Sequence, residues 1–224
     1  EGQLWYDSTA AAFKYQYPAV TSAGAWSTGG SLNTARSFLA GAGTQTSALA
    51  FGGNPGTFAV TESYDGTSWT EVNDMNTARR DLGSAGIQTS ALSFGGLNPA
   101  VSPLYTVLTE SYNGTSWTEV NDLNTGRIIL AGAGADNTSA LAFGGSAPPS
   151  TAATESWNGT SWTAVNALNT ARGQLGGVGI QTSALAFGGN TPPPRSALTE
   201  SWNGTSWTEV NDLNTARENI SGAG

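Results

Sequence analysis

Short runs of alternating apolar and polar residues recur along the chain, separated by Gly, Pro and Asn-Gly turns. One run, SALAF or SALSF, ends in Gly-Gly. A second, TESY or TESW, is followed after a short turn by a third, SWTEV or SWTAV. Runs of this length with a period of two predict β-strands, and no segment shows the 3.6-residue period of a helix. The pattern therefore predicts an all-β protein built from many short strands.

The runs belong to a repeat whose last copy reads TESWNGTSWTEVNDLNTAR. Full copies span residues 61–79, 109–127, 154–172 and 199–217, and a shortened copy, AWSTGGSLNTAR, spans 25–36. A strand-rich repeat of about 45 residues is typical of propeller blades, and the chain length divided by this period predicts five blades. We expect the aromatic anchors of the repeat to form the core between blades. These anchors are Trp26, Trp69, Trp117, Trp162, Trp207, Tyr6, Phe51, Phe94, Phe143 and Phe187.

Each copy predicts four strands, A to D. Strand A is the small, Gly-rich run after each Arg, as expected where blades crowd around one axis. Strand B is SALAF, strand C is TESW and strand D is SWTEV. The Asn-Gly or Asp-Gly dipeptide between strands C and D predicts a tight type I′ hairpin.

The two ends of the chain read as parts of one blade. ENISGAG, residues 218–224, matches strand A, while QLWYDS, AAFKY and residues 25–32 take the positions of strands B, C and D. Antiparallel pairing of these segments would close the ring and hide two sheet edges. We therefore expect one domain, residues 1–224, with Glu1 close to Gly224. Its blades are expected at about 37–76, 80–124, 128–169, 173–214, and 218–224 plus 1–33.

The order Gly-Gly, then Tyr or Trp, then Trp, then Leu and Arg resembles the kelch repeat, over essentially the whole chain. This resemblance implies a β-propeller with kelch-like blades. The wording LNTAR…GAG…QTSALAFGG…SWTEV also resembles repeats of virion structural and tail-fibre proteins of marine bacteriophages. That resemblance implies a virion or extracellular location. Galactose oxidase is a kelch-type propeller whose copper chemistry needs Cys and His, and this chain contains neither.

Composition excludes several classes of function. The formal net charge is −8 and Lys14 is the one lysine, so a basic footprint for nucleic acid is missing. No apolar run approaches the ~20 residues that span a bilayer, and we expect neither membrane insertion nor a leader sequence. The absence of Cys and His removes thiolate nucleophiles, imidazole bases and most transition-metal sites. We expect no cofactor and no resident metal.

The connections between strands B and C differ in every copy, and in an up-and-down blade they share a face with the LNTAR connections. Variable loops on a rigid scaffold are frequent binding sites. The alternative is drift in unconstrained loops. The loop residues best suited to contact a protein or sugar are Phe58, Leu104, Tyr105, Pro192, Pro193 and Arg195.

One arginine per repeat should gather on that same face. These arginines either bind an anion or glycan carboxylate, or brace the connection between blades by bonding backbone carbonyls or a neighbouring carboxylate. The ring consists of Arg36, Arg79, Arg127, Arg172 and Arg217. The repeated carboxylates could run glycoside hydrolysis or hold Ca²⁺, although an active site normally breaks the symmetry of a repeat. They are Glu62, Glu110, Glu155, Glu200, Asp74, Asp122 and Asp212.

These observations favour a non-enzymatic binding or structural module with no catalytic residues. Its variable loops would face a host-surface glycan, a host-surface protein or another virion protein. Two alternatives stay open: a fibre subunit that assembles head to tail by strand exchange, and an enzyme that acts on polysaccharides through carboxylates. The closed disc itself is expected to be monomeric.

Overall fold

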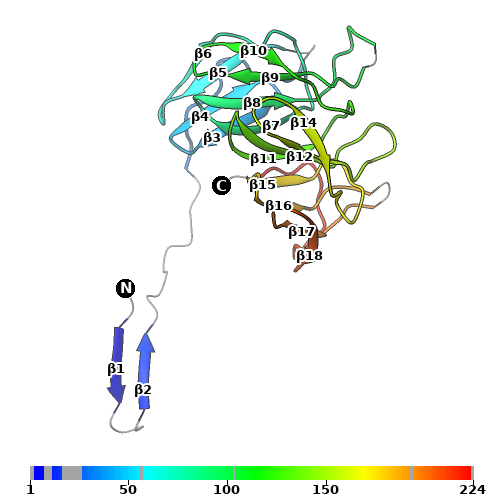
Figure 1. Cartoon of the computed structure of the whole chain (residues 1–224). Helices are drawn as coiled ribbons and strands as arrows, with labels where there is room; N and C mark the ends of the chain where they lie inside the picture. The colour runs from blue at the N-terminus through cyan, green and yellow to red at the C-terminus, as the bar shows by residue number, and fades with distance from the viewer. Residues whose placement is uncertain are drawn as a thin grey trace.

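The computed structural model describes residues 3–7, 12–16, 27–55, 58–102, 104–191 and 194–222 (Figure 1). All regular structure in this part of the chain is β-strand. None of it forms a helix that could cross a membrane.

Sixteen of the strands form four antiparallel sheets of four strands, each joined in chain order, as in the blades of a propeller-like repeat protein. Blade 1 consists of β3 (Ala40–Thr44), β4 (Ser47–Phe51), β5 (Thr61–Tyr64) and β6 (Trp69–Val72). Blade 2 consists of β7 (Gly83–Ile87), β8 (Ser90–Phe94), β9 (Thr109–Tyr112) and β10 (Trp117–Val120). Blade 3 consists of β11 (Ala131–Asp136), β12 (Ser139–Phe143), β13 (Thr154–Trp157) and β14 (Trp162–Val165). Blade 4 consists of β15 (Gly176–Ile180), β16 (Ser183–Phe187), β17 (Thr199–Trp202) and β18 (Trp207–Val210).

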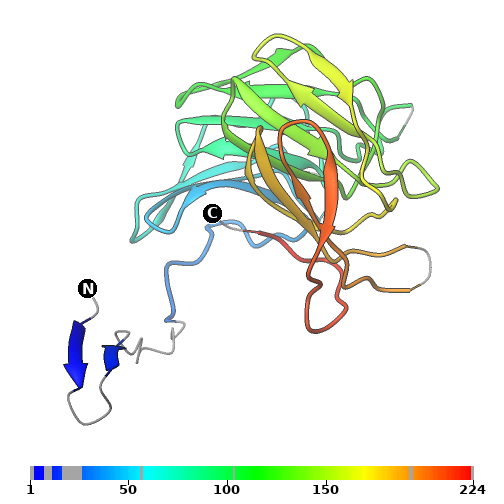
Figure 2. The same ribbon diagram turned by 60° about the horizontal axis from the view of Figure 1, so that its bottom comes forward.

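The Gly-rich run of each repeat is the inner strand of its blade, as predicted. β3, β7, β11 and β15 lie side by side in this order, with the rest of each blade fanning outward (Figures 1 and 2). A Cβ added to Gly132 would collide with the carbonyl oxygen of Ser84 on the neighbouring inner strand. Small residues are therefore needed here because the backbones of adjacent blades approach closely.

The core lies between successive blades and is built from six of the predicted aromatic anchors, three Phe and three Trp. Trp69 and Phe187, on the first and last blades, are only half-buried, so the prediction for these two is wrong. Phe94 of blade 2 packs edge-on against Trp162 of blade 3, with ring centroids 5.0 Å apart. The indole N–H of Trp162 donates to the Thr109 hydroxyl at 3.0 Å. Leu92, Leu123 and Leu130 surround this pair with apolar contacts. The other two interfaces repeat the arrangement with Phe51–Trp117 and Phe143–Trp207.

The predicted two-residue type I′ turns between strands C and D are wrong. Four residues, Asp65 to Ser68, separate β5 from β6, and of these only Gly66 has a positive φ. The Asp65 carboxylate accepts the backbone N–H groups of Thr67 and Ser68, both at 2.8 Å. An Asp or Asn side chain can close a turn in this way without a positive φ of its own. The turns at Asn113, Asn158 and Asn203 are built alike.

The expectation of five blades is also wrong, because the structure has four. β1 (Gln3–Asp7) and β2 (Ala12–Gln16) pair only with each other, as a separate two-stranded sheet. Residues 27–32, expected in strand D, and 218–222, expected as strand A, form no strand. Trp26 and the predicted proximity of Glu1 and Gly224 lie outside the described residues.

Local pairing explains the difference. β1 and β2 align in register from Gln3–Gln16 to Asp7–Ala12, which satisfies their facing backbone groups across a short connection. Closing a blade from the two chain ends instead requires contacts between residues about 200 positions apart, which form at a higher entropic cost. β2, AFKYQ, also lacks the glutamate that strand C provides in every blade. In both views the hairpin lies apart from the four blades (Figures 1 and 2).

Candidate binding face

Four of the five repeated arginines are buried between strands and form the brace of each blade. The Arg127 guanidinium donates to the carbonyl oxygens of Gly144 and Ala153 and to Glu155 Oε1, the last at 3.0 Å. Its side chain is fully buried. Burial lowers the pKa of Arg127, and the charge of Glu155 opposes that shift. Equivalent ion pairs join Arg36 to Glu62, Arg79 to Glu110, and Arg172 to Glu200.

The second oxygen of each glutamate holds the connection that enters its blade. Glu155 Oε2 accepts the backbone N–H of Asn124 at 2.8 Å and its side-chain amide at 2.7 Å. Both carboxylate oxygens are therefore engaged by the scaffold. The repeated aspartates serve the scaffold as well, since Asp122 accepts the Thr109 N–H at 3.0 Å, and Asp74 and Asp212 do likewise for Thr61 and Thr199. The described residues contain no group of three or more acidic side chains placed to hold a metal ion.

Arg217, the last of the predicted ring, has a different environment. Its side chain is exposed, and it forms no ion pair with any residue in the described ranges. Its carbonyl nevertheless accepts the Gly189 N–H at 2.9 Å, as the Arg79 carbonyl accepts that of Gly53. The backbone is thus placed as in the other repeats, and the carboxylate partner is missing.

The predicted loop residues fall into two groups. Leu104 and Arg195 are exposed, with 48% of Leu104 accessible and the Arg195 Nε 3.0 Å from Glu218 Oε1. Phe58 and Tyr105 are half-buried, and the Phe58 N–H donates to the Gly53 carbonyl at 2.9 Å. Pro192 and Pro193 lie outside the described residues. The structure thus places an apolar and a charged side chain on the outer parts of two different loops.

A second set of variable residues was not predicted. Two positions after each repeated arginine, the backbone has φ between 50° and 57° although none of the residues is glycine. Such residues are uncommon and can mark functional sites. Each of them except Phe38, the first, donates its backbone N–H to the carbonyl of its counterpart in the preceding repeat, at 2.8–3.0 Å. We call them the rim residues: Phe38, Asp81, Ile129, Gln174 and Asn219.

A sequence signal for the rim did exist. Between the repeated Arg and the Leu or Ile that follows it, the repeats read SF, RD, II, GQ and EN, a variable dipeptide inside an otherwise constant stretch. The strained backbone explains why the position is special. The side chain at this position nevertheless differs in every repeat.

The rim is continuous with the strand B–C loops. In each blade the residue before the rim residue pairs with the residue that opens the loop: Ser37 with Asn54, Arg80 with Leu97, Ile128 with Ser146, and Gly173 with Asn190. The loops extend from one side of the molecule (Figures 1 and 2). We call this surface, made of the rim residues and the four B–C loops, the variable face.

The electrostatics of the variable face are mixed. Burial raises the pKa of Asp81, and Arg80, 3.8 Å away, opposes that rise. Hydrogen bonds from Asn190 and Arg195 lower the pKa of Glu218. Phe38, 52% exposed, adds an apolar element beside Asp81, which donates its backbone N–H to the Phe38 carbonyl.

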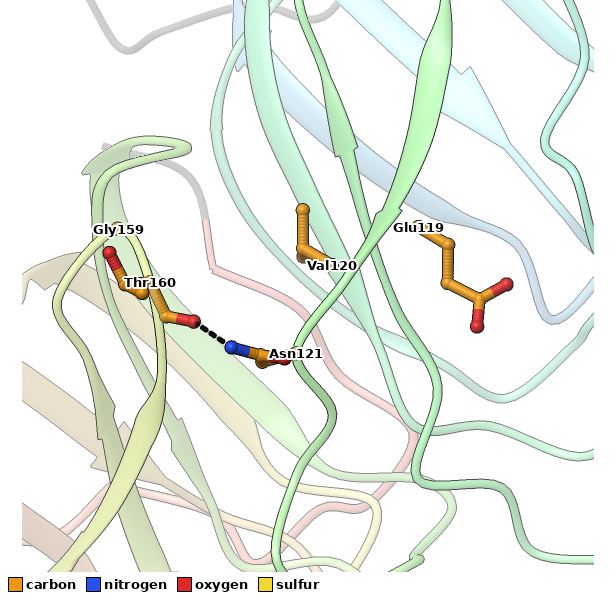
Figure 3. A pocket seen from close by; sticks show the side chains of 5 residues that line it. All are labelled: Glu119, Val120, Asn121, Gly159 and Thr160. Atoms are coloured by element: carbon orange, nitrogen blue, oxygen red, sulfur yellow. Dashed lines mark hydrogen bonds between the residues drawn. The ribbon is translucent and has the colours of Figure 1, made fainter.

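A shallow pocket lies elsewhere, where the end of β10 meets the β13–β14 turn (Figure 3). Glu119, Val120, Asn121, Gly159 and Thr160 line it. The Asn121 amide donates to the Thr160 carbonyl at 2.8 Å, and Asn73 and Asn166 make the same bond to their neighbouring blades. The pocket therefore lies at a contact between blades that recurs in the other repeats.

No protein-family model matches the chain, and no curated protein is significantly similar to it.

Proposed function

We propose that this protein is a non-enzymatic binding module that recognises its ligand through the variable face. The observation that carries the proposal is where the repeats differ. Their core, braces and C–D turns are nearly identical, whereas the rim residues and B–C loops differ in every blade and lie next to one another. Loops and strained residues held on a rigid scaffold are suited to binding.

The chemistry of this face favours a protein or glycan surface. It offers apolar side chains, Phe38, Val101 and Leu104, among charged groups such as Arg195 and Glu218. Exposed apolar groups within a polar surround are typical of macromolecular contacts. The carboxylates that could have served hydrolysis are already bonded within the blades.

The resemblance of the repeats to those of phage virion and tail-fibre proteins identifies the first ligands to test. A host-surface glycan or another virion protein would meet the variable face while the rigid blades hold the loops in place. Kelch-like organisation and a virion or extracellular location belong to the same proposal.

The test is a screen of the chain against a glycan array and a display library of virion proteins, followed by variants. The double variant Phe38→Ala, Leu104→Ala should weaken binding of any hit about tenfold or more, as expected for apolar anchors of an interface. The matched control is Ile87→Ala, since Ile87 is 45% exposed at the opposite end of an inner strand.

Exchange of residues 97–108 for the shorter loop 54–60 sharpens the test, because it alters the face but keeps the brace. The Leu108 carbonyl accepts from Arg79, and Val60, whose carbonyl accepts from Arg36, would take its place. Binding that survives replacement of all four B–C loops, or a chain that binds neither class of probe, would refute the proposal.

A further inference from the structure

The three interfaces between successive blades share one set of contacts. Blade 3 provides Phe143 and the Thr154 hydroxyl, and blade 4 provides Trp207. The ring centroids of Trp207 and Phe143 lie 4.9 Å apart, and the indole N–H donates to the Thr154 hydroxyl at 3.1 Å. Blade 4 also provides Glu200, which pairs with Arg172 of the incoming connection. A third contact comes from Gln181, whose amide donates to Ser156 Oγ at 2.9 Å and to the Trp157 carbonyl.

The outer face of blade 4 carries the groups with which blade 3 contacts blade 4, but among the described residues no further blade covers them. Leu185 is 39% exposed, whereas its counterpart Leu141 in blade 3 is completely buried. The Thr199 hydroxyl is buried and has no hydrogen-bond partner in the described structure, while Thr61, Thr109 and Thr154 each receive an indole N–H. Thr199 as a residue is 8% exposed, so water does not compensate the loss freely.

The charged half of the contact is open as well. Arg217 is exposed without a carboxylate from any described residue, although Arg172 has Glu200. Its repeat partner Asn214 is likewise exposed, whereas Asn169 donates to Glu200 at 2.9 Å. An unpaired guanidinium beside an apolar face favours an acidic partner.

The inner part of the next position is already occupied by this chain. The Asn219 N–H donates to the Gln174 carbonyl at 3.0 Å, Ile220 packs on Gly188 as Leu175 packs on Gly144, and a Cβ on Gly222 would collide with the Gly177 carbonyl. Residues 218–222 thus follow the path of an inner strand. An occupant of the open face needs to supply only the outer strands.

We propose that the open face of blade 4 binds a β-hairpin of a partner protein that carries a glutamate and, seven residues later, a tryptophan. In this chain those two groups stand on one C–D hairpin, as Glu200 and Trp207 do. The glutamate would receive Arg217 and Asn214, and the indole would pack on Phe187 and donate to Thr199. Residues 1–26 contain no acidic residue seven positions before a tryptophan, so this segment does not supply the pattern.

The probe is a synthetic peptide with the sequence of residues 199–210, closed by a terminal disulfide so that it forms a hairpin, and labelled for fluorescence anisotropy. We expect saturable binding to the whole chain. Replacement of the peptide tryptophan at the Trp207 position by alanine should weaken binding by about tenfold or more, and glutamate to glutamine at the Glu200 position by about tenfold.

Variants of the chain identify the contacts. Arg217→Ala should bind the glutamate and glutamine peptides equally, because the exposed guanidinium is what distinguishes them. Thr199→Val should bind the tryptophan peptide and a naphthylalanine peptide equally, whereas the unmodified chain prefers the indole N–H. Leu185→Arg should abolish binding, and circular dichroism of each variant verifies that the blades remain folded.

Three results would overturn the proposal. They are absence of binding, an Arg217→Ala chain that still distinguishes the two peptides, and equal binding of the alanine peptide. Sedimentation of the chain alone adds a fourth. Concentration-dependent growth that Leu185→Arg removes would assign the face to a second copy of this chain instead.

Discussion

The interface between blades 3 and 4 and the open face of blade 4 contain the same residues in two environments. In the interface, Leu141 is buried, Thr154 accepts an indole N–H and Arg172 pairs with a carboxylate. At the equivalent positions of the open face, Leu185 is exposed, the Thr199 hydroxyl has no partner and Arg217 has no carboxylate among the described residues. The comparison separates what a blade provides alone from what its neighbour adds. Strand pairing is complete in blade 4, so the backbone of a blade does not depend on a following blade.

The neighbour adds an indole, a carboxylate and an amide, each of which completes a group that the preceding blade already holds in position. This behaviour is that of a repeat protein, in which stability is a sum of units and nearest-neighbour interfaces. The same substitution should therefore have a different effect at a closed interface and at the open face.

The largest difference is expected for the arginines. Arg127→Ala leaves Glu155 buried without its counter-charge, and we expect a loss of about 3–5 kcal/mol in the free energy of unfolding. Arg217→Ala removes an exposed side chain and should change it by about 0.5 kcal/mol or less. Urea denaturation followed by tryptophan fluorescence measures both.

A similar loss in the two arginine variants would show that the charge, rather than its burial and pairing, matters. The double variant Arg127→Met, Glu155→Gln provides the control, since it removes both charges while the glutamine side-chain oxygen can still accept the Asn124 N–H, and it should cost less than Arg127→Ala alone. Retention of the full loss in the double variant would contradict the brace as described.

Much of the fold follows from the repeat, because each strand, its Gly-rich inner neighbour and its Trp–Phe contact depend on residues close in sequence or one period away. The fifth blade did not follow, because the N-terminal residues can either pair locally with each other or complete a blade with the C-terminal segment. Alignment of the repeats does not compare the free energies of these two arrangements. Residues 3–7 can pair with residues 12–16, and they do. Residues 218–222 lie beside blade 4, in keeping with their match to strand A, but a match does not provide the strand B that they would need as a partner.

Of the proposed variable face, the B–C loops were predicted from the sequence and the rim residues were missed. Variation in length drew attention to the B–C loops and to Leu104 and Arg195. The rim residues stand at a fixed distance from the repeated arginine, so no difference in length marks them. Their common feature is a positive φ, which cannot be predicted from a residue other than glycine. The arginines could be assigned to one face, yet the sequence left open whether they bind a ligand or brace the blade, because burial decides between those roles.

A smaller effect, of opposite sign at the two sites, is expected for the threonine hydroxyls. Thr154→Val deprives the buried Trp207 N–H of its acceptor and should cost about 1–3 kcal/mol. Thr199→Val replaces an unpartnered buried hydroxyl by a methyl group and should leave stability unchanged or raise it slightly. Thermal and urea unfolding of the two variants compare them directly, and an equal loss in both would show that Thr199 has a partner.

The smallest effect concerns how residues 218–222 are held on blade 4. The pKa of Glu218 lies below its ordinary value, because the Asn190 amide donates to it at 3.0 Å and Arg195 contributes a hydrogen bond at 3.0 Å and its charge. A depressed carboxylate pKa contributes stability above the unfolded value, and this contribution is lost as pH falls through the folded value. Acid should therefore loosen this segment. The equivalent segments of the closed interfaces have no carboxylate at this position, and their stability should not change through it.

Carbon-detected NMR titration of the Glu218 carboxyl measures that midpoint. Asn190→Ala and Arg195→Ala should each raise it, because both side chains stabilise the charged carboxylate. Arg80→Ala is the matched control, since Arg80 pairs with Asp81 and should leave Glu218 unaffected. Amide exchange at Asn219 should accelerate as Glu218 becomes protonated, and exchange that does not change with pH beyond its intrinsic rate would mean that backbone contacts alone hold the segment.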